Sequence, residues 1–90
     1  MIKAILIEPD DNLITITQAA KAGDEITYVL NGEEKRLKAV TDIPIYHKTV
    51  VRDLAKGDEM VKYGHFVGYA LKDIKKGEWA HCHNVDSKMP

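Results

Sequence analysis

The sequence has a single cysteine, Cys82, and no long hydrophobic run, and these two scarcities exclude whole classes of protein. One thiol cannot build an internal disulfide framework, and it suits a reducing compartment. No stretch approaches the roughly 20 apolar residues of a membrane-spanning helix. The apolar run that follows Met1 is too short for a secretory signal. We therefore expect a cytoplasmic protein with no membrane partner.

The chain also lacks a charge excess of either sign. Thirteen basic and 14 acidic side chains leave a formal net charge of −1. The basic and aromatic residues do not interleave as a nucleic-acid reader needs, so we expect no nucleic-acid partner. Ninety residues make one small domain, 1–90. The polar segment 85–90 is expected to be a loosely ordered tail.

Sustained helical periodicity is missing as well, because no window keeps it for ten residues. Short β-branched or alternating runs lie between turn residues instead, which predicts an all-β fold. Asn31-Gly32 is typical of a type I′ hairpin turn. One helical turn is expected at 18–22. Strands are expected near residues 4–7, 13–17, 26–30, 36–40, 49–51, 60–63, 66–70 and 79–83.

A short pattern recurs at 53–63 and 73–84: an acid, an apolar residue, two spacers, glycine, a second acid and a strand-like run. A weaker copy surrounds Gly23. We interpret the repeat as a reused turn that leads into a strand, a structural role that needs no functional site. The two clear copies end differently, in Lys62-Tyr63-Gly64 and in His81-Cys82-His83-Asn84. The different polar endings suggest that these ends carry chemistry.

His81 and His83 are candidate metal ligands. Residues two apart in a strand point to the same face, so both imidazoles could converge on one divalent ion. A complete site would need further ligands, for which His47, Asp53, Glu59 and Asn84 are available. The structural alternative is two polar residues on a solvated face.

Lys48 and Lys62 are candidate anion-binding residues, because an ammonium group suits a carboxylate or a phosphate. Burial can also lower the pKa of a lysine toward a role as a base. Gly64, beside Lys62, would let the backbone approach a ligand. The alternative for either lysine is a solvated surface charge.

Four motifs occur in order and together resemble one family, the SAF domain of the altronate/galactarate dehydratases, which includes the small subunit of sulfolactate sulfo-lyase. The resemblance covers most of the chain and is best from 43 to 84. The motifs are Pro44-x-x-His47-Lys48, Arg52-Asp53-Leu54-x-Lys56-Gly57-Asp58, Lys62-Tyr63-Gly64-x-x-x-Gly68-x-Ala70 and Asp73-Ile74-x-x-Gly77-Glu78-x-x-His81-x-His83-Asn84.

The resemblance implies a β-clip fold and a component of a sugar-acid dehydratase, a hydro-lyase that is inactive without a larger catalytic subunit or domain. The family reaction is a β-elimination that releases water or, in one branch, sulfite. The implied cofactor is a divalent metal, iron (Fe²⁺) in the first place and Mn²⁺ as the alternative. The implied sites are catalytic His47, Lys48 and Lys62, substrate-binding Lys48, Lys62, Tyr63, Gly64 and Asn84, and metal-binding His81 and His83.

The chain departs from the family pattern near the implied substrate. Tyr46 stands where the family has glycine before the His-Lys pair, and His65 and Phe66 replace a small polar residue and a proline. A different class of function is a non-catalytic SAF module for binding or homo-oligomerisation. Such a module does not need Lys48, His81 and His83 together, so the sequence favours the enzyme component.

Overall fold

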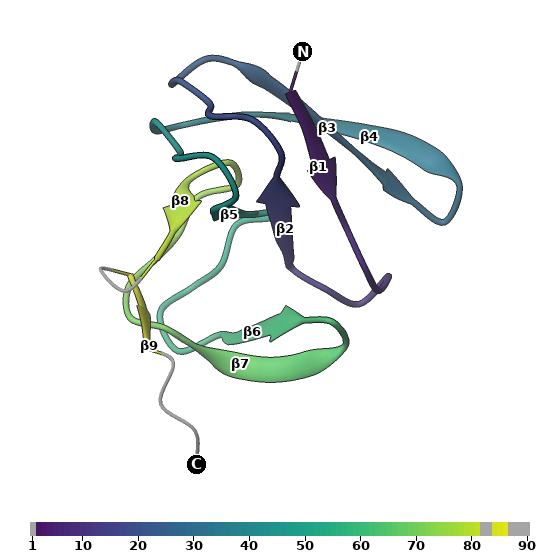
Figure 1. The fold of residues 1–90 in the computed structure, drawn as a ribbon. Helices are drawn as coiled ribbons and strands as arrows, with labels where there is room; N and C mark the ends of the chain where they lie inside the picture. Colours follow the sequence, from purple (N-terminus) through teal and green to yellow (C-terminus); the bar gives the residue numbers. More distant parts are fainter. Residues whose placement is uncertain (1, 82–83, 87–90) are drawn as a thin grey trace.

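In a computed structural model that describes residues 2–81 and 84–86, the chain folds into nine short strands without a helix (Figure 1). The all-β prediction is confirmed. None of the described segments forms a helix able to span a bilayer. The strands are β1 (Ile2–Ile5), β2 (Leu13–Ile16), β3 (Glu25–Leu30), β4 (Glu33–Lys38), β5 (Lys48–Val50), β6 (Glu59–Lys62), β7 (His65–Ala70), β8 (Trp79–Ala80) and β9 (Val85–Asp86).

The strands form two sheets, a six-stranded sheet in the order β4-β3-β1-β2-β5-β8 and a three-stranded sheet in the order β6-β7-β9. The larger sheet is mixed, because β1 pairs parallel to β3 and antiparallel to β2. Figure 1 shows the β3–β4 hairpin at one end of the molecule and the β6–β7 hairpin at the other. β9, which includes Val85 of the expected loose tail, pairs with β7; residues 87–90 lie outside the described part.

Two clusters of buried apolar side chains form the core, and β2 contributes to both. Ile14 and Ile16 belong to the first cluster, whereas Leu13 belongs to the second. This division follows from strand alternation, which sends successive side chains to opposite faces. The first cluster also holds Ile2, Ala20, Ile26, Tyr28, Leu37, Ala39 and Ile43, and the second holds Val50, Leu54, Met60, Ala70, Ile74 and Ala80.

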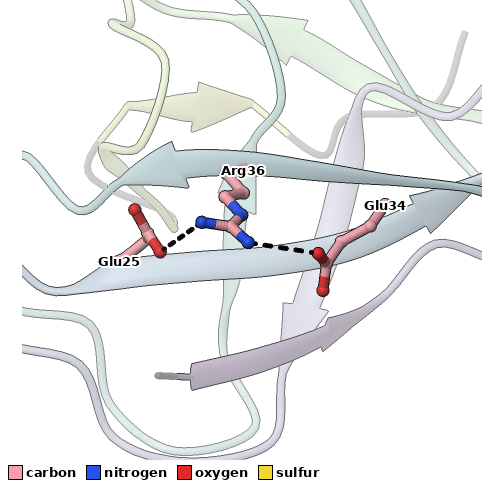
Figure 2. Close-up of polar contacts among 3 residues, drawn as sticks. All are labelled: Glu25, Glu34 and Arg36. Carbon is pink, nitrogen blue, oxygen red and sulfur yellow. Dashed lines mark hydrogen bonds and ion pairs between the residues drawn. The ribbon is translucent and has the colours of Figure 1, made fainter.

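The β3–β4 hairpin turns as the sequence predicts. Asn31 and Gly32 both have positive φ angles, 51° and 82°, as a type I′ turn requires. On the outer strand Arg36 forms ion pairs with Glu25 at 3.5 Å and Glu34 at 3.4 Å (Figure 2). These exposed pairs stabilise the fold little. Charged side chains do, however, protect an edge strand such as β4 from pairing with other chains.

The helical turn expected at 18–22 is wrong. Ala20 instead forms an isolated antiparallel bridge with Ile43. The two residues exchange N–H···O bonds of 2.9 and 2.8 Å. This long-range pairing satisfies the backbone groups that a local turn would otherwise use.

The recurring pattern is one turn, as interpreted from the sequence. In each copy the second acid accepts a hydrogen bond from the N–H three residues earlier, and its own N–H donates back to the carbonyl of that residue. The acid-accepting bonds are Lys21 N to Asp24 Oδ2 at 2.9 Å, Ala55 N to Asp58 Oδ2 at 2.8 Å and Lys75 N to Glu78 Oε1 at 3.0 Å.

A fourth copy, which the sequence hides, runs from Ile43 to Lys48. The His47 N–H donates to the Pro44 carbonyl at 3.1 Å, as the acid does in the other copies. Tyr46 takes the glycine position and has a φ of 65°, which is unfavourable for a side chain of this size. The copy escaped detection because its glycine and its second acid are absent, although the first acid, Asp42, is present.

The strand expected at 79–83 is wrong at His81, because β8 ends at Ala80. His81 lies in a bend, and its carbonyl accepts the N–H groups of Asn84 and Val85 at 3.0 and 2.9 Å. The premise that His81 sits in an extended strand therefore does not hold. His83 and Cys82 lie outside the described residues.

Candidate functional site

A cavity of about 410 Å³ lies where the two sheets meet, a volume within the usual range of small-molecule sites. Four of the predicted site residues, from three separate segments, line it together. They are Lys48 of β5, Lys62 at the end of β6, Tyr63 of the following turn and His81 after β8.

The rest of the described lining is apolar and comes from both sheets. It consists of Leu13, Val67, Ala80 and Val85. An apolar wall lowers the local dielectric and strengthens the attraction between a cation and an anionic ligand. Two ammonium groups above such a wall favour a compact anion.

Lys62 is almost completely buried, with 3% of its surface exposed. Burial lowers the pKa of its ammonium group; the charge of Asp11 opposes the lowering, and that of Lys48 adds to it. Among the described residues Lys62 takes part in none of the ion pairs. Its Nζ lies 4.4 Å from the centre of the Tyr63 ring, a weakly favourable cation–π contact. A buried ammonium without an anionic partner is costly, so this arrangement is typical of a ligand site.

Asp11, in the connection between β1 and β2, holds the hairpin that carries Lys62. Its carboxylate accepts the N–H of Gly64 at 2.8 Å and that of Tyr63 at 3.0 Å. It also accepts the N–H of Glu8 at 3.2 Å. Burial on its own would raise the pKa of Asp11, but the three backbone donors and the charge of Lys62 outweigh burial and lower it.

Asn12 binds the backbone of β6, the strand that ends at Lys62. Its Nδ2 donates to the Glu59 carbonyl and its Oδ1 accepts the Val61 N–H, both at 2.7 Å. Asp11 and Asn12 are therefore site-building residues that the sequence reasoning missed. The only local signal was the polar cluster 10–12, and it is equally typical of an ordinary turn.

Three rings meet beside the cavity. The centres of His47 and His81 lie 5.1 Å apart, and Trp79 stacks on His81 at 5.1 Å. The Trp79 Nε1–H donates to Nδ1 of His47 at 3.2 Å. Because indole can only donate, Nδ1 carries no proton, and the neutral imidazole holds its proton on Nε2. His47 is not among the described residues that line the cavity and reaches it through His81.

Asn84 and Gly64 lie close to the site but are committed to other contacts. The Asn84 side chain is fully buried, accepting the His81 N–H at 2.9 Å and donating to the Trp79 carbonyl at 2.8 Å. The Gly64 N–H is bound by Asp11. Neither residue is among the described lining. Their contacts position His81 and Lys62, and direct binding of substrate by either residue stays a prediction.

The described donors do not form a metal site by themselves. His81 reaches the cavity and His47 lies beside it, but no group of three or more His, Cys, Asp or Glu residues comes together within 2–81 and 84–86. His47 already uses Nδ1 for Trp79. A divalent ion bound through His81 would need ligands beyond the described residues, and His83 remains the predicted second one.

Comparison with known proteins shows similarity to one family along nearly the whole chain. The family model for the altronate/galactarate dehydratase SAF domain matches residues 2–88. The (2R)-sulfolactate sulfo-lyase subunit alpha of Chromohalobacter salexigens is 32% identical over 87 residues, which are 93% of both chains. That of Paracoccus pantotrophus is 40% identical over 53 residues, 59% of this chain and 79% of the relative.

A longer relative is similar along almost the whole of this chain. The altronate dehydratase of Bacillus subtilis is 30% identical over 86 residues, which are 94% of this chain but 16% of that protein. The similarity to the dehydratases is therefore confined to a small part of their length. The family model, by contrast, covers nearly every residue, and on that match the chain belongs to the altronate/galactarate dehydratase SAF-domain family.

Proposed function

We propose that this chain is the small subunit of a β-eliminating lyase, and that its cavity binds the carboxylate of a hydroxylated or sulfonated acid. One observation carries the proposal: Lys48, Lys62 and His81 line a single cavity with an apolar wall. The names of the relatives support it, since two are sulfolactate sulfo-lyase alpha subunits and one is an altronate dehydratase.

The chemistry suits the residues present. When a proton leaves the carbon next to a carboxylate, negative charge develops on the carboxylate oxygens. Water or sulfite then leaves the neighbouring carbon as the double bond forms. Fixed cations that face this charge stabilise the transition state. Lys48 and Lys62 would bind the carboxylate, and the Nε2–H of His47 would donate a hydrogen bond to the departing oxygen.

The proposed metal site comprises His81 and His83, with iron (Fe²⁺) as the first candidate and Mn²⁺ as the second. A divalent metal would supply Lewis-acid stabilisation of the same developing charge. What supports this proposal is the position of His81 in the cavity lining. The chain's own lysines do not depend on the metal for their carboxylate contact.

A larger subunit is the proposed partner, because the lining of this cavity supplies only part of the chemistry and small-molecule sites favour interfaces. The designation "subunit alpha" of two relatives supports a second component. The chain alone would then be inactive. Hydro-lyase activity in particular, the cytoplasmic location and possible homo-oligomers remain predictions.

The test is reconstitution with a larger dehydratase-like subunit, assayed on altronate, galactarate and (2R)-sulfolactate. Lys62→Met and Lys48→Met should each lower kcat/KM by about 100-fold or more, the usual loss for a removed charge-stabilising group. Lys56→Met, at an exposed turn, is the matched control and should change kcat/KM less than about twofold. The double variant His81→Ala/His83→Ala should lose both turnover and bound metal.

Wild-type turnover in both lysine variants would overturn the carboxylate role. In that case the alternative, a non-catalytic binding module, would account for the chain better. Full metal content and full turnover in the double histidine variant would overturn the metal role separately.

A further inference from the structure

We propose that Asp11 is a positioning residue for Lys62: it fixes the turn that aims the ammonium into the cavity, and it supplies a negative charge that favours the protonated amine without covering it. The inference rests on the anion-binding role proposed for the cavity. Asp11 itself lies outside the cavity lining and would not touch substrate.

Asp11 holds the turn that directly follows Lys62. Lys62 is the last residue of β6 and pairs with His65 across the two-residue turn Tyr63-Gly64. Tyr63 has a φ of 56°, which costs a bulky residue energy. The two bonds that Asp11 accepts, from Tyr63 and Gly64, stabilise this turn directly. Since Lys62 immediately precedes the turn, holding the turn also holds the direction of its side chain.

The Asp11 carboxylate is directed at backbone N–H groups and away from the Lys62 ammonium. Oδ1 accepts the Gly64 N–H, and Oδ2 accepts those of Tyr63 and Glu8. Both oxygens are therefore occupied by backbone donors, and no ion pair within 4.0 Å joins Asp11 to Lys62. The two charges nevertheless act on each other. The negative charge of Asp11 thus favours the protonated form of Lys62 without forming an ion pair with it. The ammonium stays accessible to an anion in the cavity.

The neighbouring groups show why a counter-charge is needed. The ammonium lies over the ring of Tyr63, and the same cavity is lined by Lys48 of β5 and by His81 after β8. Burial and Lys48 both act to lower the pKa of Lys62, and Asp11 is the group that raises it. Without Asp11, more of Lys62 would be neutral and unable to attract an anion.

The experiment uses the full 90-residue chain labelled with ¹³C and ¹⁵N, and follows the Lys62 ε-methylene signals against pH, assigned by their loss in Lys62→Met. Asp11→Asn removes the charge and keeps one acceptor oxygen; because Nδ2 cannot accept an N–H, the bonds to one carboxylate oxygen are lost as well, which the Tyr63 and Gly64 amide signals report. It should lower the titration midpoint of Lys62 by about one pH unit. Asp24→Asn makes the same change in the repeat copy around Gly23, which carries none of the cavity lysines, and should leave the midpoint unchanged.

A second measurement needs no variant. As wild-type protein is acidified below the ordinary Asp pKa of 3.8, protonation of Asp11 should shift the Tyr63 and Gly64 amide signals and the Lys62 ε signals with one common midpoint. An unchanged Lys62 midpoint in Asp11→Asn would overturn the proposal. Wild-type Lys62 signals that do not shift when Asp11 is protonated would overturn it as well. A purely structural clamp would not move the Lys62 midpoint in Asp11→Asn.

Malonate binding provides a separate readout for the cavity. Malonate should shift the Lys62 signals in wild-type protein, and the affinity should fall in Lys62→Met. If malonate fails to bind while Asp11→Asn still moves the Lys62 midpoint, the anion-binding role fails and the influence of Asp11 on Lys62 stands. The reverse pattern removes the role of Asp11 and leaves the anion site intact.

Discussion

Two residues, Lys62 and Tyr46, occupy positions that disfavour their own side chains. Lys62 carries a charge although only 3% of its surface is exposed, and Tyr46 holds a left-handed backbone angle that glycine would adopt without strain. Such unfavourable placements persist where surrounding structure enforces them, and they concentrate near functional sites. Both residues adjoin the candidate site: Lys62 lines the cavity, and Tyr46 directly precedes His47.

Tyr46→Gly should raise the free energy of unfolding by about 0.5–1 kcal/mol, because relief of left-handed strain exceeds the added flexibility of the unfolded chain. Tyr46 is 69% exposed, so little packing is lost. Urea denaturation measures the effect. Ile45→Gly is the control: Ile45 is also exposed, but its φ is not positive, and the change should destabilise. A destabilised Tyr46→Gly would show that the ring makes contacts that outweigh the strain.

At the scale of elements, the repeated turn is the unit that builds the fold. Each copy brings its Gly-equivalent N–H to a distant backbone carbonyl, as Gly57 does with Ala70 at 2.8 Å and Gly77 with Val50 at 3.1 Å. The copies are alike in backbone and differ in their surroundings. Gly77 lies against the chain at 38–40, where its carbonyl accepts the Val40 N–H at 2.9 Å, whereas Gly57 faces open space.

Substitution of alanine at these two glycines should separate backbone strain from crowding. Both have nearly the same φ, 89° at Gly77 and 92° at Gly57. Gly57→Ala should cost about 1 kcal/mol from strain alone. Gly77→Ala would also drive its Cβ into the Lys38 carbonyl, so the cost should reach at least about 3 kcal/mol. Equal unfolding midpoints for the two variants would contradict the close approach.

At the scale of the whole molecule, two small sheets are joined by polar contacts and share a cavity at their junction. Asp11 and Asn12, in the connection between β1 and β2, bind the backbone of the β6–β7 hairpin. The cavity that results contains a buried charge which the isolated chain does not neutralise by an ion pair among its described residues. The molecule therefore gives up stability at the place proposed for binding.

Lys62→Met should make the isolated chain more stable at neutral pH, because the buried charge is removed and the volume is nearly kept. The pKa of Lys62 is lower in the folded than in the unfolded chain. The buried charge therefore lowers the free energy of unfolding of the wild-type protein most at low pH, and this loss disappears as pH rises to the ordinary lysine pKa of 10.5. The stability difference between variant and wild type should shrink accordingly in urea titrations at several pH values.

Lys72→Met, at an exposed position, should show neither the gain nor its pH dependence. A Lys62→Met variant that is less stable than wild type at neutral pH would contradict the view that this charge is held at a cost. If Lys62→Met gains stability and loses activity in the reconstituted complex, Lys62 contributes to binding at a cost in stability.

The sequence alone determined the features that depend on neighbours along the chain. Alternating apolar residues predicted the all-β fold, Asn31-Gly32 predicted its turn, and the recurring Gly-acid pattern predicted a shared unit. The candidate lysines and His81 were also found from local motifs, and they meet in one cavity. These signals are readable because side-chain periodicity and positive φ angles are set by adjacent residues.

Only the tertiary structure decided what depends on contacts between distant segments. Asp11 reaches Tyr63 and Gly64 across 52 and 53 residues, and the Ala20–Ile43 bridge replaces the helical turn that local residues favoured. The same is true of the hidden fourth turn, whose form at Tyr46 is imposed by the bond from its N–H to Ile16. The residues next to a polar side chain in the sequence are the same whether it accepts hydrogen bonds from its own turn or from a distant one. The folded backbone determines which N–H donors lie within reach of that side chain.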